Sequence, residues 1–326
     1  AGSEKPCIYS VPNKKQSYDI NSNEYILESL IEKAILNTVR WITMKCKPQE
    51  PDYVAALSTR FLKDFFNILV AVFPNYDFSV SGVYCHQKPI VNIGLEKKPE
   101  LGDILFIYVD RKQNGVRNLN SLLLQAKMSN YSRLKIHDSE KHQLKLYKNW
   151  PQFTYYRAGN LNGTKRNIFP KTINDGAQYL LINDNPLTKR ICYEKRMYSM
   201  GCAVPDDIMY INDSLSKELI NFLKFKSGRT FDNNPYSTDD DWSKMIWDLL
   251  KIAAFKFSKR KNAQLGSFSR VNEYNHFYTE NMRETTLFEE ALKGDNNVDK
   301  LFDEDTAGVS VVLVESRLKR EQEEVY

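Results

Sequence analysis

The sequence has no run of about 18 apolar residues, which argues against a membrane-spanning helix. Its first residues, AGSEKP, lack the charged and then apolar segments of a secretion signal. The five cysteines form neither a CxxC pair nor a cysteine and histidine cluster with zinc spacing. We therefore expect free thiols in a reducing compartment, in a cytoplasmic protein that does not bind membranes.

The chain also lacks a strong excess of charge of either sign. A net charge of +5 over 326 residues permits nucleic-acid binding but does not require it. The basic stretch KFSKRK at residues 256–261 and the pair Lys165 and Arg166 are more often solvated surface than a phosphate track. Internal repeats and a clean interdomain linker are also missing from the sequence.

What the sequence does contain is a series of alternating helix and strand patterns. Apolar residues recur with a helical period over residues 21–45, and residues 53–73 form a second apolar segment that predicts one helix. Further helices are predicted at residues 139–149, 214–226 and 238–258, and short strands at residues 76–85, 90–93, 178–183, 207–212 and 308–315. This order predicts an α/β fold.

Residues 100–147 are the stretch around which the rest of the chain is organised. Residues 103–110 are an apolar β-type run, and residues 121–128 form the returning strand. Between them stands Asn114-Gly115, which is a strong hairpin signal. The sequence therefore predicts an antiparallel hairpin with an apolar body.

Polar groups meet at one end of this predicted hairpin. Pairing the strands about the turn places Asp103 opposite Ala126 or Lys127. Gln125 and Lys127 are two residues apart, so both side chains project from the same face of their strand. Because an unpaired buried charge is costly, the group forms either a structural Asp103–Lys127 ion pair, solvated strand ends or a functional site.

The helix predicted at residues 139–149 adds two more polar side chains. Gln143 and Tyr147 are four residues apart and share one helix face. With Gly102-Asp103 and Gln125-x-Lys127, they form a set that resembles the PD-(D/E)XK nuclease superfamily. Its Gln-x-Lys variant is similar to Mrr-type restriction endonucleases, and Gln143-x-x-x-Tyr147 resembles the RecB and lambda-exonuclease branch. The resemblance covers about residues 55–150.

The resemblance implies a restriction-endonuclease-like mixed sheet flanked by helices. We expect residues 21–160 to form this nuclease core with its preceding helices. Residues 161–316 then form an α/β elaboration or a second domain, after a flexible segment at residues 1–20 and before a charged tail at residues 317–326.

Hydrolysis of a phosphodiester needs an activated water and a counter-charge for the phosphate, and a divalent ion supplies both. The resemblance implies Mg²⁺ or Mn²⁺ held by Asp103 and by the neutral carbonyl oxygen of Gln125. Lys127 would orient or deprotonate the water, or stabilise the phosphate. Members of the superfamily often add an acid from a preceding helix, and Glu28 and Glu32 are equal candidates for it.

Four further residues complete the predicted site. By resemblance, Gln143 and Tyr147 contact the DNA backbone or tune the site. Glu100 stands at the edge of the site, and His86 lies at a strand-to-turn junction upstream of the hairpin. We therefore consider all four as substrate-binding candidates.

The sequence thus predicts a Mg-dependent nuclease that acts on DNA, with restriction, phage defence or repair as settings that the resemblance implies. The first alternative is a catalytically inactive nuclease-fold subunit that binds nucleic acid or a protein partner. The second is a scaffold whose aromatic-rich second half recognises a protein or nucleotide. Enzymes of this fold often act as pairs, so a homodimer is expected from the resemblance alone.

Overall fold

The computed structural model describes residues 24–44, 47–129, 133–171, 175–183, 191–193, 196–262, 277–281, 286–294, 300, 302–303 and 305–319. The predicted flexible segment at residues 1–20 lies outside the described residues, as does the charged tail from residue 320 onward.

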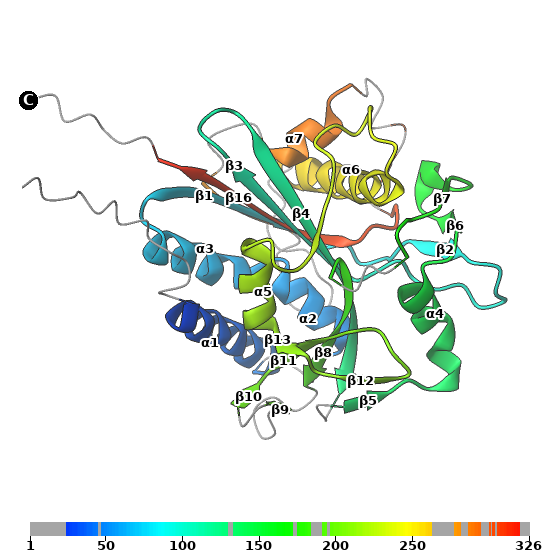
Figure 1. Ribbon diagram of the computed structural model, residues 1–326, viewed down its shortest axis with the longest axis horizontal. Helices are drawn as coiled ribbons and strands as arrows, with labels where there is room; N and C mark the ends of the chain where they lie inside the picture. Colours follow the sequence, from blue (N-terminus) through cyan, green and yellow to red (C-terminus); the bar gives the residue numbers. More distant parts are fainter. Residues whose placement is uncertain are drawn as a thin grey trace, which may run out of the picture.

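A nine-stranded mixed sheet forms the centre of the molecule (Figure 1). Its strands follow the order β13-β11-β8-β4-β3-β16-β1-β15, and β14 pairs with β4 beside this path. Their bounds are β1 (Tyr76–Val83), β3 (Ile104–Arg111), β4 (Arg117–Ser129), β8 (Ala177–Asn183), β11 (Met200–Ala203), β13 (Asp213–Ser214), β14 (Arg229–Thr230), β15 (Phe277–Glu280) and β16 (Ser310–Leu318). The α/β prediction, with a mixed sheet flanked by helices, is confirmed.

Helices cover both faces of this sheet (Figure 1). One face carries α1 (Glu24–Thr43), α2 (Glu50–Leu57), α3 (Arg60–Val72) and α5 (Leu215–Leu223). The other carries α4 (Lys141–Asn149), α6 (Asp241–Asn262) and α7 (Leu287–Leu292). Alternate residues of β3 enter the two cores, with Ile104 facing the first group of helices and Leu105 facing the second.

Among the described residues, three small sheets and two 3-10 turns surround this centre. The small sheets comprise β2 (Ile90–Asn92) with β6 (Phe153–Arg157) and β7 (Lys165–Arg166), β5 (Arg133–Lys135) with β12 (Ile208–Tyr210), and β9 (Ile191–Tyr193) with β10 (Arg196–Tyr198). The turns are η2 (Asp138–Glu140) and η3 (Gly159–Leu161).

The predicted hairpin forms, but its register differs by one residue from the expected one. Ile104 pairs with Leu124, so the midpoint of the hairpin is Asn114. The expected midpoint lay between Asn114 and Gly115. The reason is a three-residue loop: Gly115 donates to the Lys112 carbonyl in a tight turn and adopts a left-handed φ of 82°. The residue directly opposite Asp103 is therefore Gln125, and not Ala126 or Lys127.

The single helix predicted over residues 53–73 is wrong, because two helices occupy that stretch. They are separated by Ser58 and Thr59, whose hydroxyls bond back to the Val54 and Ala55 carbonyls. Gly82 of β1 lies against this break, and a Cβ there would stand 1.9 Å from the Ser58 carbonyl oxygen. The close approach of β1 therefore fixes where the helices separate.

The second half of the chain completes the sheet that the first half begins. Strand β8 runs parallel to β4 after the α4 crossover, and β11 and β13 extend that edge. Strand β16 inserts between β1 and β3, parallel to β3 and antiparallel to β1. Strands from both sides of the boundary expected near residue 160 therefore belong to one sheet.

Candidate active site

Asp103 lies at the end of the sheet, immediately before β3, and only 4% of its surface is exposed. Its Oδ2 atom accepts hydrogen bonds of 2.7 Å from the Gln125 side-chain amide and 2.7 Å from the Ala126 backbone N–H. These donors come from β4, the partner strand in the hairpin. The hairpin thus brings the predicted acid and amide into direct contact.

Burial raises the pKa of the Asp103 carboxyl to about 6, because a carboxylate loses hydration inside the protein. The positive charge of Lys88 and the Ala126 hydrogen bond oppose this increase, while the nearby charge of Glu100 adds to it. Lys88 is itself buried, and its Nζ atom donates to the Cys85 carbonyl at 2.7 Å and to the Asp103 carbonyl at 3.4 Å. Sequence analysis did not identify Lys88 as part of this region.

Lys127 lies two residues beyond Gln125 on β4, but it does not form the ion pair with Asp103 that the sequence suggested as one alternative. Its Nζ atom is 2.6 Å from Glu140 Oε1, at the end of η2. Burial lowers the Lys127 pKa, but the Glu140 hydrogen bond and the charges of Glu50, Glu140 and Asp103 raise it above its usual value. The alternative of a structural Asp103–Lys127 ion pair is therefore replaced by a Lys127–Glu140 pair.

Glu50 is the acid near this cluster that sequence analysis missed. It is the first residue of α2, and burial followed by the charge of Asp103 raises its pKa to about 7. The charge of Lys127 opposes this increase. A sequence signal for this helix was present, because Gln49 and Asp52 have the three-residue spacing of a capping box among the prolines of residues 47–52. In the structure Asp52 accepts a 2.7 Å hydrogen bond from the Gln49 N–H at the start of α2.

The two acids predicted as the additional metal ligand, Glu28 and Glu32, lie on α1, which packs against α3 and α5. Both carboxylate oxygens of Glu32 are engaged there, accepting from the Ser199 N–H at 3.3 Å and the Ser216 hydroxyl at 3.0 Å. Neither glutamate is among the charges that act on Asp103, Glu50 or Lys127. Glu32 is therefore occupied by contacts within the protein, and a metal-binding acid on the first helix stays a prediction.

Gln143 and Tyr147 lie on the inner face of α4 and hold the chain that leads into Asp103. Gln143 donates to the Glu100 carbonyl at 2.8 Å and accepts from the Glu100 N–H at 2.9 Å. The Tyr147 hydroxyl donates to the Leu101 carbonyl at 2.8 Å. A Cβ on Gly102 would lie 2.8 Å from that hydroxyl, so glycine leaves the room that this contact needs.

Both side chains are too deeply buried to meet a DNA backbone, since Gln143 is 6% exposed and Tyr147 is 1% exposed. The predicted substrate contact is therefore corrected to a positioning role. Glu100 is half-buried beside the site, where its charge raises the pKa values of Asp103 and Glu50. His86 is exposed, and its Nδ1 atom lies 3.4 Å from the Tyr84 hydroxyl.

The oxygen atoms of this site suit a hard divalent cation. Gln125 Oε1 is buried and has no hydrogen-bond partner among the described residues, although the amide nitrogen of the same side chain binds Asp103. Carboxylate and amide oxygens are the ligands that Mg²⁺ prefers, and Mg²⁺ keeps several waters. Within the described ranges, no three His, Cys, Asp or Glu side chains converge as a ready metal cluster. Asp103 and Gln125 therefore fit a water-rich site with few protein ligands.

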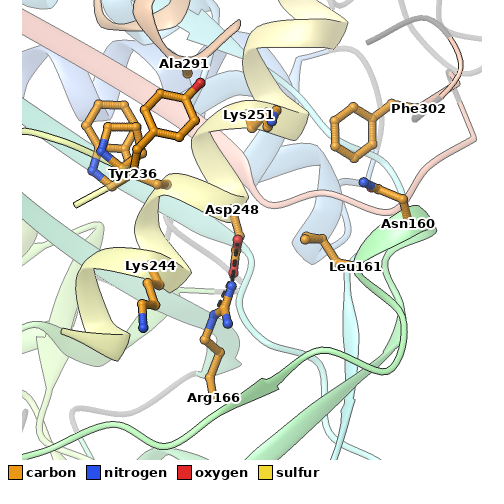
Figure 2. A pocket seen from close by; sticks show the side chains of 11 residues that line it. Asn160, Leu161, Arg166, Tyr236, Lys244, Asp248, Lys251, Ala291 and Phe302 are labelled. Atoms are coloured by element: carbon orange, nitrogen blue, oxygen red, sulfur yellow. Dashed lines mark hydrogen bonds and ion pairs between the residues drawn. The ribbon is translucent and has the colours of Figure 1, made fainter. Parts of the chain in front are cut away.

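A polar cavity lies over α6, away from Asp103, and Figure 2 shows Arg166 directed at Asp248 within it. Arg166 Nε donates to Asp248 Oδ2 at 3.0 Å, its NH2 group donates to Oδ1 at 3.1 Å, and the Tyr155 hydroxyl donates to Oδ2 at 2.9 Å. Burial raises the pKa of Asp248 to about 6. This acid is thus buried like Asp103 but fully paired.

Comparisons with protein families, curated proteins and solved structures found no match to this chain. Among the helices of the described ranges, none is long and apolar enough to cross a membrane.

Proposed function

We propose that the protein is a metal-dependent nuclease that hydrolyses phosphodiester bonds in DNA. The observation that carries the proposal is the buried Asp103–Gln125 pair, in which the amide oxygen of Gln125 has no hydrogen-bond partner among the described residues. A buried polar atom is rarely left unpaired without a reason, and a bound Mg²⁺ or Mn²⁺ supplies one. Lys127 and Glu50, which act electrostatically on one another and on Asp103, complete the site.

In this proposal Asp103 and Gln125 hold the cation, and Glu50 supplies the acidic oxygen that the neutral Gln125 lacks. The bound cation would lower the pKa of a coordinated water and neutralise charge on the phosphate. The raised pKa of Lys127 keeps its side chain an ammonium at neutral pH, so Lys127 stabilises the phosphate or orients the water and does not act as the base.

The proposal is tested by incubating the protein with supercoiled plasmid, linear duplex and single-stranded DNA in Mg²⁺ or Mn²⁺. Asp103→Ala and Lys127→Ala should each abolish cleavage. The control is Lys112→Ala, which removes an exposed cation at the opposite end of the hairpin and should leave cleavage unchanged. Melting curves must show all variants folded, and a wild-type protein that cleaves none of the three substrates would contradict the proposal.

Glu50→Gln separates the role of Glu50 from that of Asp103. It removes a charge but keeps the shape of the side chain, so the metal concentration needed for half-maximal cleavage should rise by about tenfold. Glu32→Gln is the matched control on α1 and should leave this concentration unchanged.

A second candidate is a nuclease-fold subunit without catalytic activity that binds nucleic acid or a protein partner. It is favoured by the 2.6 Å Lys127–Glu140 pair, which engages the ammonium, and by the neutrality of Gln125. If this candidate is right, Lys127→Ala lowers the melting temperature and wild type binds DNA without cutting it. Restriction or phage defence, and a homodimeric state, remain proposals that rest on the resemblance.

A further inference from the structure

A small antiparallel ribbon, formed by β5 and β12, stands beside the candidate active site (Figure 1). Its register pairs Tyr210 with Arg133 and Ile208 with Lys135. Side chains directly opposite one another in a ribbon lie on the same face. Each cation of β5 therefore has an apolar or aromatic neighbour on β12.

These four side chains form the outer face of the ribbon. Between them, Leu134 and Met209 point the other way and pack into the core that contains α4. Tyr210 is 57% exposed, Ile208 is 40% exposed, and both cations are exposed as well. The outer face thus offers an aromatic ring and an aliphatic side chain, each beside a positive charge.

The two cations of this face are not held in ion pairs among the described residues, although the charge of Lys135 lowers the pKa of the exposed Asp138 after the larger effect of Lys141. Neither Arg133 nor Lys135 forms an ion pair with another of the described residues. Three acids lie close along the chain, but each is paired with a lysine outside the ribbon: Asp138 with Lys141 at 2.6 Å, and Asp206 and Asp207 with Lys148 at 2.8 and 3.0 Å. The ribbon therefore suits a polyanion with exposed apolar groups.

The ribbon is tied to the helix that supports the candidate active site. The Ile136 N–H donates to the Asp207 carbonyl at 3.1 Å, and Lys148 of α4 binds Asp207. Glu140, the partner of Lys127, lies five positions after Lys135 along the chain. A chain of that length spans at most about 18 Å, or about five nucleotides of one strand.

We propose that the outer face of the β5–β12 ribbon binds an unpaired segment of the DNA substrate, within a few nucleotides of the cleavage site. Tyr210 stacks on a base, while Arg133 and Lys135 contact the flanking phosphates. An exposed ring beside a cation, here Tyr210 opposite Arg133, can bind any base, because every base has a flat face. The inference rests on the proposed function for the identity of the substrate, and it adds a preference for single-stranded DNA over duplex.

The experiment measures binding apart from cleavage. A fluorescein-labelled single-stranded DNA of about 16 nucleotides, and its duplex, are titrated by anisotropy in EDTA over a range of salt concentrations. Tyr210→Ala should weaken single-strand binding by about tenfold, while Tyr210→Phe keeps the ring and should bind like wild type. The double variant Arg133→Ala, Lys135→Ala should make the slope of log K against log salt concentration shallower by about 1.4, which is about 0.7 for each lost phosphate contact.

The controls separate this inference from the proposed function. Lys112→Ala removes a distant exposed cation and should leave both affinity and salt dependence unchanged. Wild-type affinity in Tyr210→Ala, or tighter binding of duplex than of single strand, would overturn the inference. If the ribbon variants lose DNA binding while wild type never cleaves DNA, the inference stands and the proposed function fails. If wild type cleaves DNA and the ribbon variants bind it as wild type does, the proposed function stands and the inference fails.

Discussion

Asp103 and Asp248 are two buried aspartates whose pKa values are both raised to about 6 by burial, and their surroundings differ. Asp248 is matched by an arginine through two hydrogen bonds and by a tyrosine hydroxyl. Among the described residues, the carboxylate of Asp103 receives hydrogen bonds only from neutral donors, the Gln125 amide and the Ala126 N–H. The raised pKa alone therefore does not distinguish a structural acid from a functional one.

We propose that the pairing of the neighbouring polar atoms makes the distinction. Around Asp248 the guanidinium of Arg166 supplies a full counter-charge, so the pair is complete within the protein (Figure 2). Around Asp103 the buried cation Lys88 is directed at backbone carbonyls, and Gln125 Oε1 remains without a hydrogen-bond partner among the described residues. A buried carboxylate next to an unsatisfied amide oxygen is the arrangement that a divalent cation would complete.

The largest expected difference between the two acids is in catalysis. Asp103→Asn keeps the shape of the side chain but removes its charge, so metal-dependent plasmid cleavage should fall by at least about 100-fold. Asp248→Asn should retain cleavage per folded molecule. Rates are compared at the same folded fraction, measured by circular dichroism. Equal losses of cleavage in the two variants would remove the basis of the distinction.

Stability should change in the opposite sense. Asp248→Asn leaves the half-buried Arg166 guanidinium with no charged partner, which should lower the free energy of unfolding by about 1.5–3 kcal/mol. Asp103→Asn removes a charge that no salt bridge compensates, so the free energy of unfolding at pH 7 should be unchanged or higher. Urea denaturation measures both. A strong destabilisation by Asp103→Asn would identify Asp103 as a structural acid instead.

The pH dependence of stability sharpens the comparison further. The folded protein holds a proton on Asp103 up to a pH of about 6, whereas an unfolded chain loses it at about pH 4. The stabilising contribution of the protonated group is therefore complete below about pH 4 and is lost as pH rises to about 6, a change of about 3 kcal/mol. In urea titrations without metal, Asp103→Asn should show a weaker decline over this window.

Added Mg²⁺ should distinguish the two acids at neutral pH. A cation that binds only the folded state raises the free energy of unfolding by mass action. Mg²⁺ should therefore stabilise wild type and Asp248→Asn near pH 7 but not Asp103→Asn. Stabilisation of Asp103→Asn equal to that of wild type would place the cation elsewhere.

The sequence allowed the polar end of the hairpin to be predicted, because strand alternation alone puts Gln125 and Lys127 on one face. The exact partner in the facing strand could not be predicted, since one residue in the loop with a left-handed φ shifts the register by one. The burial of Gln143 and Tyr147 was also missed. Helical spacing shows that the two share a face but does not show what covers that face.

Contacts between distant parts of the chain account for the other differences. Strand β16 enters the sheet next to β3 although about 200 residues separate them, and no local pattern encodes that neighbour. Glu50 joins Asp103 because α2 packs across the sheet end, whereas the sequence offered only a proline-rich break at that position. The sequence therefore pointed to the longer helix α1, which packs against α3, α5 and α2.

The smallest expected effect comes from the tyrosines that support each acid. Tyr147→Phe removes the hydrogen bond to the Leu101 carbonyl, which positions the chain two residues before Asp103, and should cost about 1 kcal/mol of stability. If that bond aligns Asp103, kcat for DNA cleavage should fall by about fivefold while DNA binding in EDTA is unchanged. Tyr155→Phe is the matched control, because it removes the hydroxyl bonded to Asp248. It should lower stability by a similar amount and leave kcat unchanged, so equal kcat values in the two variants would mean that Tyr147 supports the fold and not the site.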